Sequence, residues 1–140
     1  MAPHSLAVRV YYEDTDFSGV VYHASYLRFL ERGRTEFLRA LGIAHRGGFG
    51  ADGFHFVVRA MTVEFLKPAL MDDELCVETH PSATRGAAID MTQKIRRGGD
   101  GKTLDREFPL VELLVHPKTL ARQSIKRGYA PGVSVYANLN

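Results

Sequence analysis

The sequence contains no tryptophan, a single cysteine (Cys76) and no long uninterrupted apolar run. One cysteine excludes an intrachain disulfide, which fits a reducing compartment. A membrane-spanning helix needs about 18 or more consecutive apolar residues, so we expect no integral membrane association. The first residues lack a basic segment followed by an apolar one, the pattern of a secretory signal. From these absences we predict a cytoplasmic protein.

An excess of charge of one sign is also missing. The chain carries 18 Lys and Arg against 16 Asp and Glu, a net charge of +2. This balance does not favour binding to nucleic acid. The six histidines show no metal-ligand spacing, so we predict no metal and no cofactor. The length of 140 residues and the 45% hydrophobic content predict one globular domain over 1–140.

Apolar periodicity predicts a strand, a loop and a long helix in the first third of the chain. Residues 6–12 alternate between apolar and polar, as in a strand, and residues 13–22 have the composition of a loop. Residues 23–41 have helical spacing. The apolar residues near one face of this helix are Tyr26, Leu30, Phe37 and Leu41, with Leu27 and Leu38 beside them.

Two glycines indicate where this predicted helix ends and where it contacts a sheet. Gly42 follows it at the position of a C-terminal cap. Gly33 interrupts it at a cost of about 1 kcal/mol relative to alanine, which favours close backbone contact with a neighbouring sheet. Four later runs are predicted to form strands in an antiparallel meander: 54–66, 75–80, 87–97 and 104–115. The fold class is therefore α+β, and the tail from about residue 117 is expected to be a mobile end or an oligomer contact.

Acidic residues gather immediately before the predicted helix. Tyr12, Asp14 and Asp16 are two residues apart and would share one side if the strand continued. Two nearby carboxylates raise each other's pKa, and burial raises it further, a setting used for catalytic bases and nucleophiles. The free N–H groups of a helix that starts near His23 could hold an oxyanion. Turn chemistry and binding of a hard cation are the alternatives for this acidic pair.

Two stretches resemble a known family. The first stretch, residues 12–36, resembles hotdog-fold thioesterases of the 4-hydroxybenzoyl-CoA thioesterase class. It contains Tyr12, Asp16, Gly19 and His23 in the pattern YEDTD…GVVYHASY…ER.RTE. Within that class they are most similar to the YbgC-type acyl-CoA thioesterases associated with the bacterial Tol-Pal system. Residues 56–73 (FVVRAMTVEF, then KPA and DD) resemble the same family. The resemblance implies one long helix wrapped by an antiparallel sheet of about five strands.

The resemblance also implies roles for individual residues. Asp16 would be the catalytic carboxylate, acting as nucleophile or general base. The backbone N–H near His23 would hold the oxyanion, the His23 ring could bind the carbonyl or orient Asp16, and Tyr12 could donate to Asp16. The residues expected to contact substrate are Phe17, Gly19, Val20, Tyr26, Arg59, Lys67 and Arg85. The substrate would be an acyl thioester of coenzyme A or of acyl carrier protein, bound between the subunits of a homodimer or homotetramer.

Three alternatives remain at this stage. Glu31 on the helix is the rival catalytic carboxylate, although its spacing from Arg34 also suits a surface ion pair, as does that of Arg32 and Glu36. A hotdog hydratase or dehydratase would use a histidine and a carboxylate on a carbon atom. A non-catalytic module would bind acyl-CoA or a protein. Phe17 stands where relatives commonly have a smaller residue, so the pocket beside Asp16 is expected to be narrower.

Overall fold

The computed structural model describes residues 3–42, 54–58, 60–85, 88–98, 109–115 and 120–124. One long helix is accompanied by seven strands within these residues. The elements are β1 His4–Arg9, the 3-10 turn η1 Tyr12–Asp14, α1 His23–Ala40, β2 Phe54–Val58, β3 Met61–Phe65, β4 Glu74–Arg85, β5 Ala88–Arg97, β6 Val111–Val115 and β7 Leu120–Ser124.

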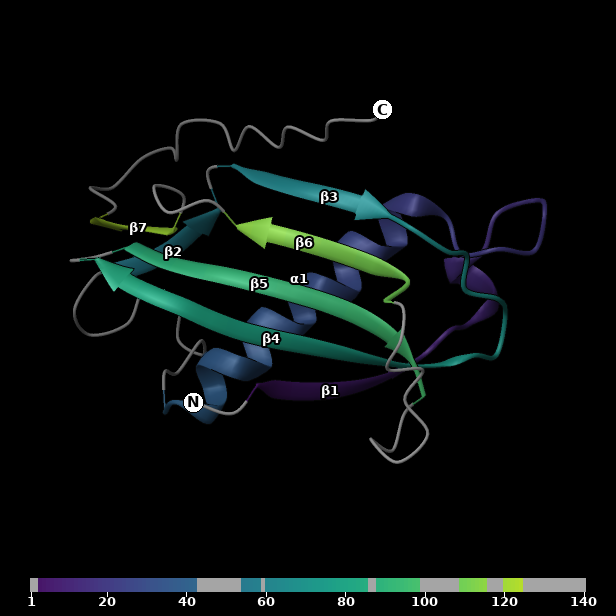
Figure 1. Cartoon of the computed structure of the whole chain (residues 1–140), viewed down its shortest axis with the longest axis horizontal. Helices are drawn as coiled ribbons and strands as arrows, with labels where there is room; N and C mark the ends of the chain where they lie inside the picture. Colours follow the sequence, from purple (N-terminus) through teal and green to yellow (C-terminus); the bar gives the residue numbers. More distant parts are fainter. Residues whose placement is uncertain are drawn as a thin grey trace.

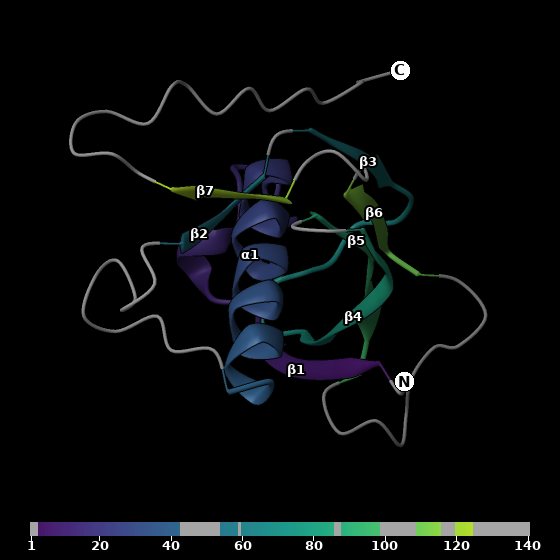
Figure 2. The same ribbon diagram turned by 90° about the vertical axis from the view of Figure 1, so that its left-hand side faces the viewer.

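The main sheet has five strands in the order β1-β4-β5-β6-β3, and every neighbouring pair is antiparallel. Strands β2 and β7 form a separate antiparallel pair. The main sheet curves along one side of α1, so that a single helix covers its inner face (Figures 1 and 2). The predicted α+β class, with one long helix on an antiparallel sheet of five strands, is confirmed.

The strand predictions need three corrections. The run 54–66 is not one strand, because β2 and β3 join different sheets. Only β4, β5 and β6 form a meander, and β3 lies at the sheet edge beside β6. Part of the expected tail is ordered as β7, paired with β2, while residues 125–140 lie outside the described part of the chain.

The predicted helix is confirmed with small changes at its end. It runs from His23 to Ala40, and Gly42 follows with a φ of +82°, a left-handed conformation that suits a C-terminal cap. Leu41 was expected on the buried face but is 50% exposed, because it lies after the last helical turn. The buried helix residues are Ser25, Tyr26, Phe29, Leu30, Gly33, Phe37 and Leu38. Among the described residues, no helix is both long and apolar enough to cross a bilayer.

Gly33 lies where the helix meets the sheet most closely. A Cβ atom at this position would be 2.7 Å from Val77 Cγ1, 3.1 Å from Gln93 Nε2 and 3.2 Å from Thr79 Oγ1. Val77 and Thr79 belong to β4, and Gln93 belongs to β5. The prediction that this glycine allows close contact with a sheet is therefore confirmed.

A buried polar network surrounds this contact. The Gln93 side chain is fully buried, and its Nε2 donates to the Leu30 carbonyl and to Thr79 Oγ1, at 2.9 Å each. Its Oε1 accepts a hydrogen bond of 2.8 Å from Arg34 Nη1. Burial lowers the pKa of Arg34, and the nearby charge of Glu31 opposes that shift. Arg34 thus hydrogen-bonds the sheet through Gln93, where surface pairing with Glu31 was expected.

The other predicted helix pair also differs. Glu36 pairs with Arg39, one helical turn further along. Arg32 instead places its guanidinium 6.0 Å from the centre of the Phe29 ring. Both arrangements keep the charged groups on the exposed side of α1.

Candidate active site

Asp16 occupies a tight reverse turn between η1 and α1. Its N–H donates to the Val20 carbonyl at 2.8 Å, and the Gly19 N–H donates to the Asp16 carbonyl at 3.1 Å. Thr15 and Val21 form an antiparallel bridge below the turn. Gly19 has a φ of +82°, which costs a glycine little and other residues more. Backbone bonds thus hold this turn of residues 15–21, which we call the Asp16 turn.

The Asp16 carboxylate is exposed and accepts two hydrogen bonds from Ser18. Its Oδ1 lies 2.6 Å from Ser18 Oγ and 2.8 Å from Ser18 N. The Ser18 hydroxyl and then the Ser18 N–H lower the pKa of Asp16 below its ordinary value of 3.8, while slight desolvation opposes them. The expectation of a pKa raised by burial and by a second carboxylate is therefore wrong for this chain. Asp16 is an ionised carboxylate at neutral pH.

The expected alignment of Tyr12, Asp14 and Asp16 is also wrong. Strand β1 ends at Arg9, and η1 rotates the chain at residues 12–14. Tyr12 is 81% exposed, whereas Asp14 is only 5% exposed. A one-turn helix breaks the period of two that places alternate strand residues on one side. Asp14 and Asp16 therefore have separate environments.

Asp14 connects the start of the turn to the helix. Its Oδ2 accepts the Tyr11 N–H at 2.8 Å, and its Oδ1 lies 3.4 Å from Arg28 Nη2. The same Arg28 nitrogen donates to Ser25 Oγ at 3.0 Å. The Asp14 carbonyl accepts the Tyr22 N–H at 2.9 Å, directly before α1. This buried carboxylate thus fixes how the Asp16 turn enters the helix.

The helix begins at His23, five residues after Ser18. Its N-cap residue, Tyr22, makes no side-chain capping hydrogen bond, so its side chain does not occupy the N–H groups of the first turn. The His23 ring lies 4.4 Å from the Tyr22 ring and 6.2 Å from the Phe65 ring, measured between centroids. Of the N–H groups in the first turn, that of Ser25 donates to the Tyr22 carbonyl at 2.8 Å. The helix start as a whole carries a partial positive charge and can bind an anion.

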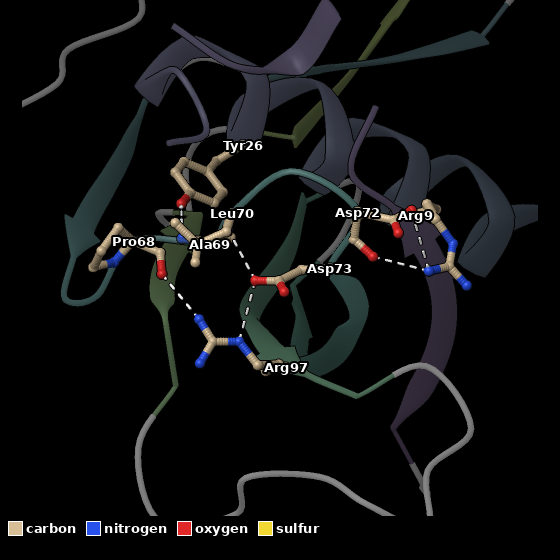
Figure 3. Close-up of polar contacts among 8 residues, drawn as sticks. All are labelled: Arg9, Tyr26, Pro68, Ala69, Leu70, Asp72, Asp73 and Arg97. Carbon is tan, nitrogen blue, oxygen red and sulfur yellow. Dashed lines mark hydrogen bonds and ion pairs between the residues drawn. The ribbon is translucent and has the colours of Figure 1, made fainter. Parts of the chain in front are cut away.

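The loop of residues 68–73 lies beside the Asp16 turn. Leu70 forms an antiparallel bridge with Val20, and the Val21 N–H donates to the Ala69 carbonyl at 2.9 Å. From the helix side, the buried Tyr26 hydroxyl accepts the Ala69 N–H at 2.9 Å (Figure 3). Burial raises the pKa of Tyr26, so its hydroxyl stays neutral.

Large apolar side chains of the Asp16 turn, of the residues that flank it and of the 66–71 segment remain exposed. Phe17, at the tip of the turn, is fully exposed, and Leu70, whose backbone forms a bridge with Val20, is 49% exposed. Tyr11, Tyr12, Tyr22, Leu66 and Met71 are exposed as well. A group of exposed large apolar residues marks a surface that binds another molecule.

The structure brings only some of the predicted substrate-contacting residues together. Phe17, Gly19 and Val20 share the turn with Asp16, and Tyr26 supports the adjoining loop from the core. Lys67 is exposed after β3, and its backbone N–H donates to the Leu110 carbonyl. Arg59 lies outside the described residues.

Arg85 lies far from this group within one chain. Strand β4 begins at Glu74, next to the 68–73 loop, and Arg85 is its last residue. Twelve strand residues extend roughly 35–40 Å, so a single chain does not place Arg85 beside Asp16. The Arg85 side chain lies outside the described part of the structure.

Two other features of the described residues bear on the site. No three side chains among His, Cys, Asp and Glu gather there in a way that could hold a metal ion. A cavity of about 340 Å³ lies between β1 and α1, lined by residues 6–9 together with Tyr11, Asp14 and Arg32. The Asp16 carboxylate does not line this cavity, so we do not assign the cavity to the chemistry of the Asp16 turn.

Sequence reasoning missed two residues near the site. Asp73 and Arg97 form an ion pair of 3.2 Å below the 68–73 loop, although they are 24 residues apart (Figure 3). The sequence shows Asp73 only as the second residue of an acidic pair and Arg97 only as the end of a basic strand. Nothing local could have connected them, because their contact depends on the pairing of β4 with β5.

One helix on a curved five-stranded antiparallel sheet, with a carboxylate turn at the start of the helix, defines a hotdog fold of the thioesterase type. The sequence profile of the thioesterase superfamily matches residues 18–104. The chain belongs to the thioesterase superfamily.

Individual relatives agree with this assignment. The chain is 42% identical to the acyl-CoA thioester hydrolase YbgC of Escherichia coli O6:H1 over 120 residues, which are 86% of this chain and 87% of that protein. It is 46% identical to the acyl-CoA thioesterase YbgC of Haemophilus influenzae over 93 residues, 66% of this chain and 68% of that protein.

Solved structures show the same architecture. A probable thioesterase from Bartonella henselae is 42% identical and superimposes with a TM-score of 0.75, covering 88% of this chain and 93% of that chain. The 4-hydroxybenzoyl-CoA thioesterase of Pseudomonas sp. strain CBS-3 is 18% identical with a TM-score of 0.70, covering 81% of each chain. The second likeness concerns the fold alone.

Proposed function

We propose that this chain hydrolyses the thioester bond of acyl-CoA to a free acid and coenzyme A, with Asp16 as the catalytic carboxylate. The activity is supported by the relatives that are named acyl-CoA thioester hydrolases. The observation that carries the role of Asp16 is its ionised, exposed carboxylate on a turn fixed by backbone bonds, just before a helix start. The superfamily profile matches from residue 18 onward and does not include Asp16. The proposed role of Asp16 is therefore argued from the geometry of the turn.

The proposed reaction can take two routes from the same position. As a nucleophile, an Asp16 oxygen would bond to the thioester carbonyl carbon, the carbon–sulfur bond would break, and water would then hydrolyse the mixed anhydride. As a general base, Asp16 would accept a proton from the water that attacks this carbon. In both routes the sulfur leaves as coenzyme A thiolate and takes up a proton.

The start of α1 is the proposed site for the developing negative charge. In both routes the carbonyl oxygen becomes an oxyanion, and the N–H groups near His23 would stabilise it. The His23 ring and the exposed Tyr12 are proposed as further catalytic contacts. The proposed acyl-binding surface comprises Phe17, Gly19, Val20 and the neighbouring Tyr26, and the proposed contacts to coenzyme A are Arg59, Lys67 and Arg85.

The proposal includes a homodimer or homotetramer in the cytoplasm. Within the described residues, β3 is an edge strand of the main sheet, and edge strands pair readily with another chain. The exposed apolar residues around Asp16 would be covered by a second subunit, which would also complete the substrate site. Light scattering of the purified protein measures this: a monomer at working concentration would contradict it.

The test of the activity is thiol release from short-chain, long-chain and aromatic acyl-CoAs by the wild type and by Asp16→Asn. The wild type is expected to hydrolyse at least one of them, and Asp16→Asn is expected to lose about 10²-fold or more in kcat. The matched control is Glu31→Gln, which removes one carboxylate from an exposed helix position and should retain its kcat.

Each contrary result has its own meaning. Normal activity of Asp16→Asn together with loss in Glu31→Gln would move the chemistry to the helix. Binding of acyl-CoA without thiol release would indicate a binding module. Addition or loss of water across a carbon–carbon bond of the acyl chain would indicate a hydratase or dehydratase.

A further inference from the structure

The 68–73 loop, which connects β3 to β4, contains a closed turn. The Asp73 N–H donates to the Leu70 carbonyl at 3.1 Å, and the Leu70 N–H donates to Asp73 Oδ2 at 2.9 Å (Figure 3). Asp72, inside this turn, has a φ of +69°, an uncommon conformation for a residue with a side chain. Asp73 therefore closes the turn twice, with its backbone N–H and with its side-chain carboxylate.

Arg97 connects this turn to the main sheet. As the last residue of β5 it donates from Nε to Asp73 Oδ2 at 3.2 Å and from Nη2 to the Pro68 carbonyl at 3.1 Å (Figure 3). One planar guanidinium thus contacts both ends of the 68–73 loop, a geometry that lysine cannot reproduce. Tyr26 fixes the middle of the loop by accepting the Ala69 N–H.

A continuous path of contacts runs from this ion pair to the Asp16 backbone. Asp73 binds the Leu70 N–H, Leu70 forms a bridge with Val20, and the Val20 carbonyl accepts the Asp16 N–H at 2.8 Å. The Val21 N–H provides a parallel link to the loop through Ala69. Every step of this path is a hydrogen bond or a strand bridge.

We infer that Asp73 and Arg97 are positioning residues for the hydrolytic reaction, which hold the Asp16 turn against the start of α1 through the 68–73 loop. This inference rests on the proposed catalytic role of Asp16. Catalysis depends steeply on placement, since a displacement of about 1 Å can cost on the order of 10²-fold in rate. A residue that touches no substrate can therefore control kcat.

The solvent exposure of Asp73 and Arg97 distinguishes a positioning role from a purely structural one. The Arg97 side chain is 46% exposed and that of Asp73 is 23% exposed, so their ion pair should contribute little to global stability. The sheet offers a matched comparison in Lys94 and Glu112, which form a 3.1 Å pair between β5 and β6 with exposures of 32% and 38%. The inference predicts that only the first pair affects the reaction.

The first experiment measures kcat, KM and thermal midpoint for Asp73→Ala, Asp73→Asn and Glu112→Ala with the best acyl-CoA substrate. Asp73→Ala should lower kcat roughly tenfold or more with KM within about twofold, because ground-state binding is retained while the carboxylate is misplaced. Asp73→Asn should recover part of kcat, since its amide oxygen can still accept the Leu70 N–H. Glu112→Ala should match the wild type.

The second experiment follows amide hydrogen exchange at Val21, whose N–H is bound to the loop, and needs no substrate. Exchange at Val21 should accelerate in Asp73→Ala and in Arg97→Gln, but not in Glu112→Ala. Unchanged kcat and unchanged exchange in Asp73→Ala would overturn the inference. The inference would also be overturned, in favour of a structural role, if Asp73→Ala and Asp73→Asn lowered kcat by the same factor and the thermal midpoint by the same amount. Full activity of Asp16→Asn would instead overturn the proposed function.

Discussion

The middle of α1 and its beginning are held in opposite ways. Around Gly33 the helix contacts β4 and β5 so closely that no Cβ atom fits, and the fully buried Gln93 satisfies three polar partners there. Around His23 the helix meets the Asp16 turn, which is held by backbone bonds and carries the exposed side chain of Phe17.

This contrast separates stability from chemistry along one helix. Close packing and buried hydrogen bonds fix the helix axis in the middle, where substitutions should unfold the protein. At the start, Asp16, Phe17 and Ser18 are exposed, so substitutions of these three should change the proposed reaction and leave the folded state intact. The tightly packed middle of α1 thus keeps the first turn of the helix in a fixed position.

Gly33→Leu tests the rigid middle and should have the largest effect on stability. The new side chain would clash with Val77, and we expect the free energy of unfolding to fall by about 3 kcal/mol. Urea denaturation measures this change. The control is Ala40→Leu, which places the same side chain at an exposed position of the same helix. Equal stability of the two variants would show that the helix is not packed tightly at Gly33.

Gln93→Leu removes the buried network while keeping a side chain of similar size. Leu30, Thr79 and Arg34 would each lose a hydrogen-bond partner, and we expect a loss of about 2 kcal/mol in unfolding free energy. Thr92→Val, which removes one hydroxyl from the adjacent position of β5, is the control for this measurement. A loss no greater than that of Thr92→Val would contradict the importance of the network.

Ser18→Ala tests the open end and should affect pH dependence alone. In the proposed mechanism the active form carries ionised Asp16, so activity should be lost as pH falls through the pKa of Asp16. Removing the Ser18 hydroxyl removes the largest cause that lowers this pKa. The acid limb of kcat/KM should therefore move to higher pH, with an unchanged rate at pH values where Asp16 is ionised in both proteins.

The control for this profile is Thr15→Val. The Thr15 hydroxyl donates to the Tyr12 carbonyl, so its removal should leave the acid limb in place. An acid limb that does not move in Ser18→Ala would mean that a different group controls the ionisation seen in the rate.

Local patterns in the sequence predicted the elements that depend on local interactions. The spacing of Tyr26, Leu30 and Phe37 predicted α1, Gly42 predicted its end, and Gly33 predicted its close contact with the sheet. A helix has hydrogen bonds between near neighbours, so its signal lies within one stretch of sequence.

Features that depend on distant residues or on short turns could not be predicted in the same way. The alternation of residues did not predict the different burial of Asp14 and Asp16, because a single 3-10 turn sends one inside and leaves the other in solvent. The burial of Gln93 depends on its partners on α1 and β4, which lie far from it in the sequence. The separation of β2 from β3 and the pairing of β2 with β7 are likewise non-local.

The backbone anchoring of the Asp16 turn has a consequence for how this enzyme family can change. The hydrogen bonds at the base of the turn belong to main-chain atoms, and the Phe17 side chain at its tip is fully exposed. Replacing Phe17 would therefore leave these backbone bonds in place and, in the proposed mechanism, would alter the surface next to the catalytic carboxylate. In the proposed enzyme, a single substitution at this position could change substrate preference while the fold of the turn is retained.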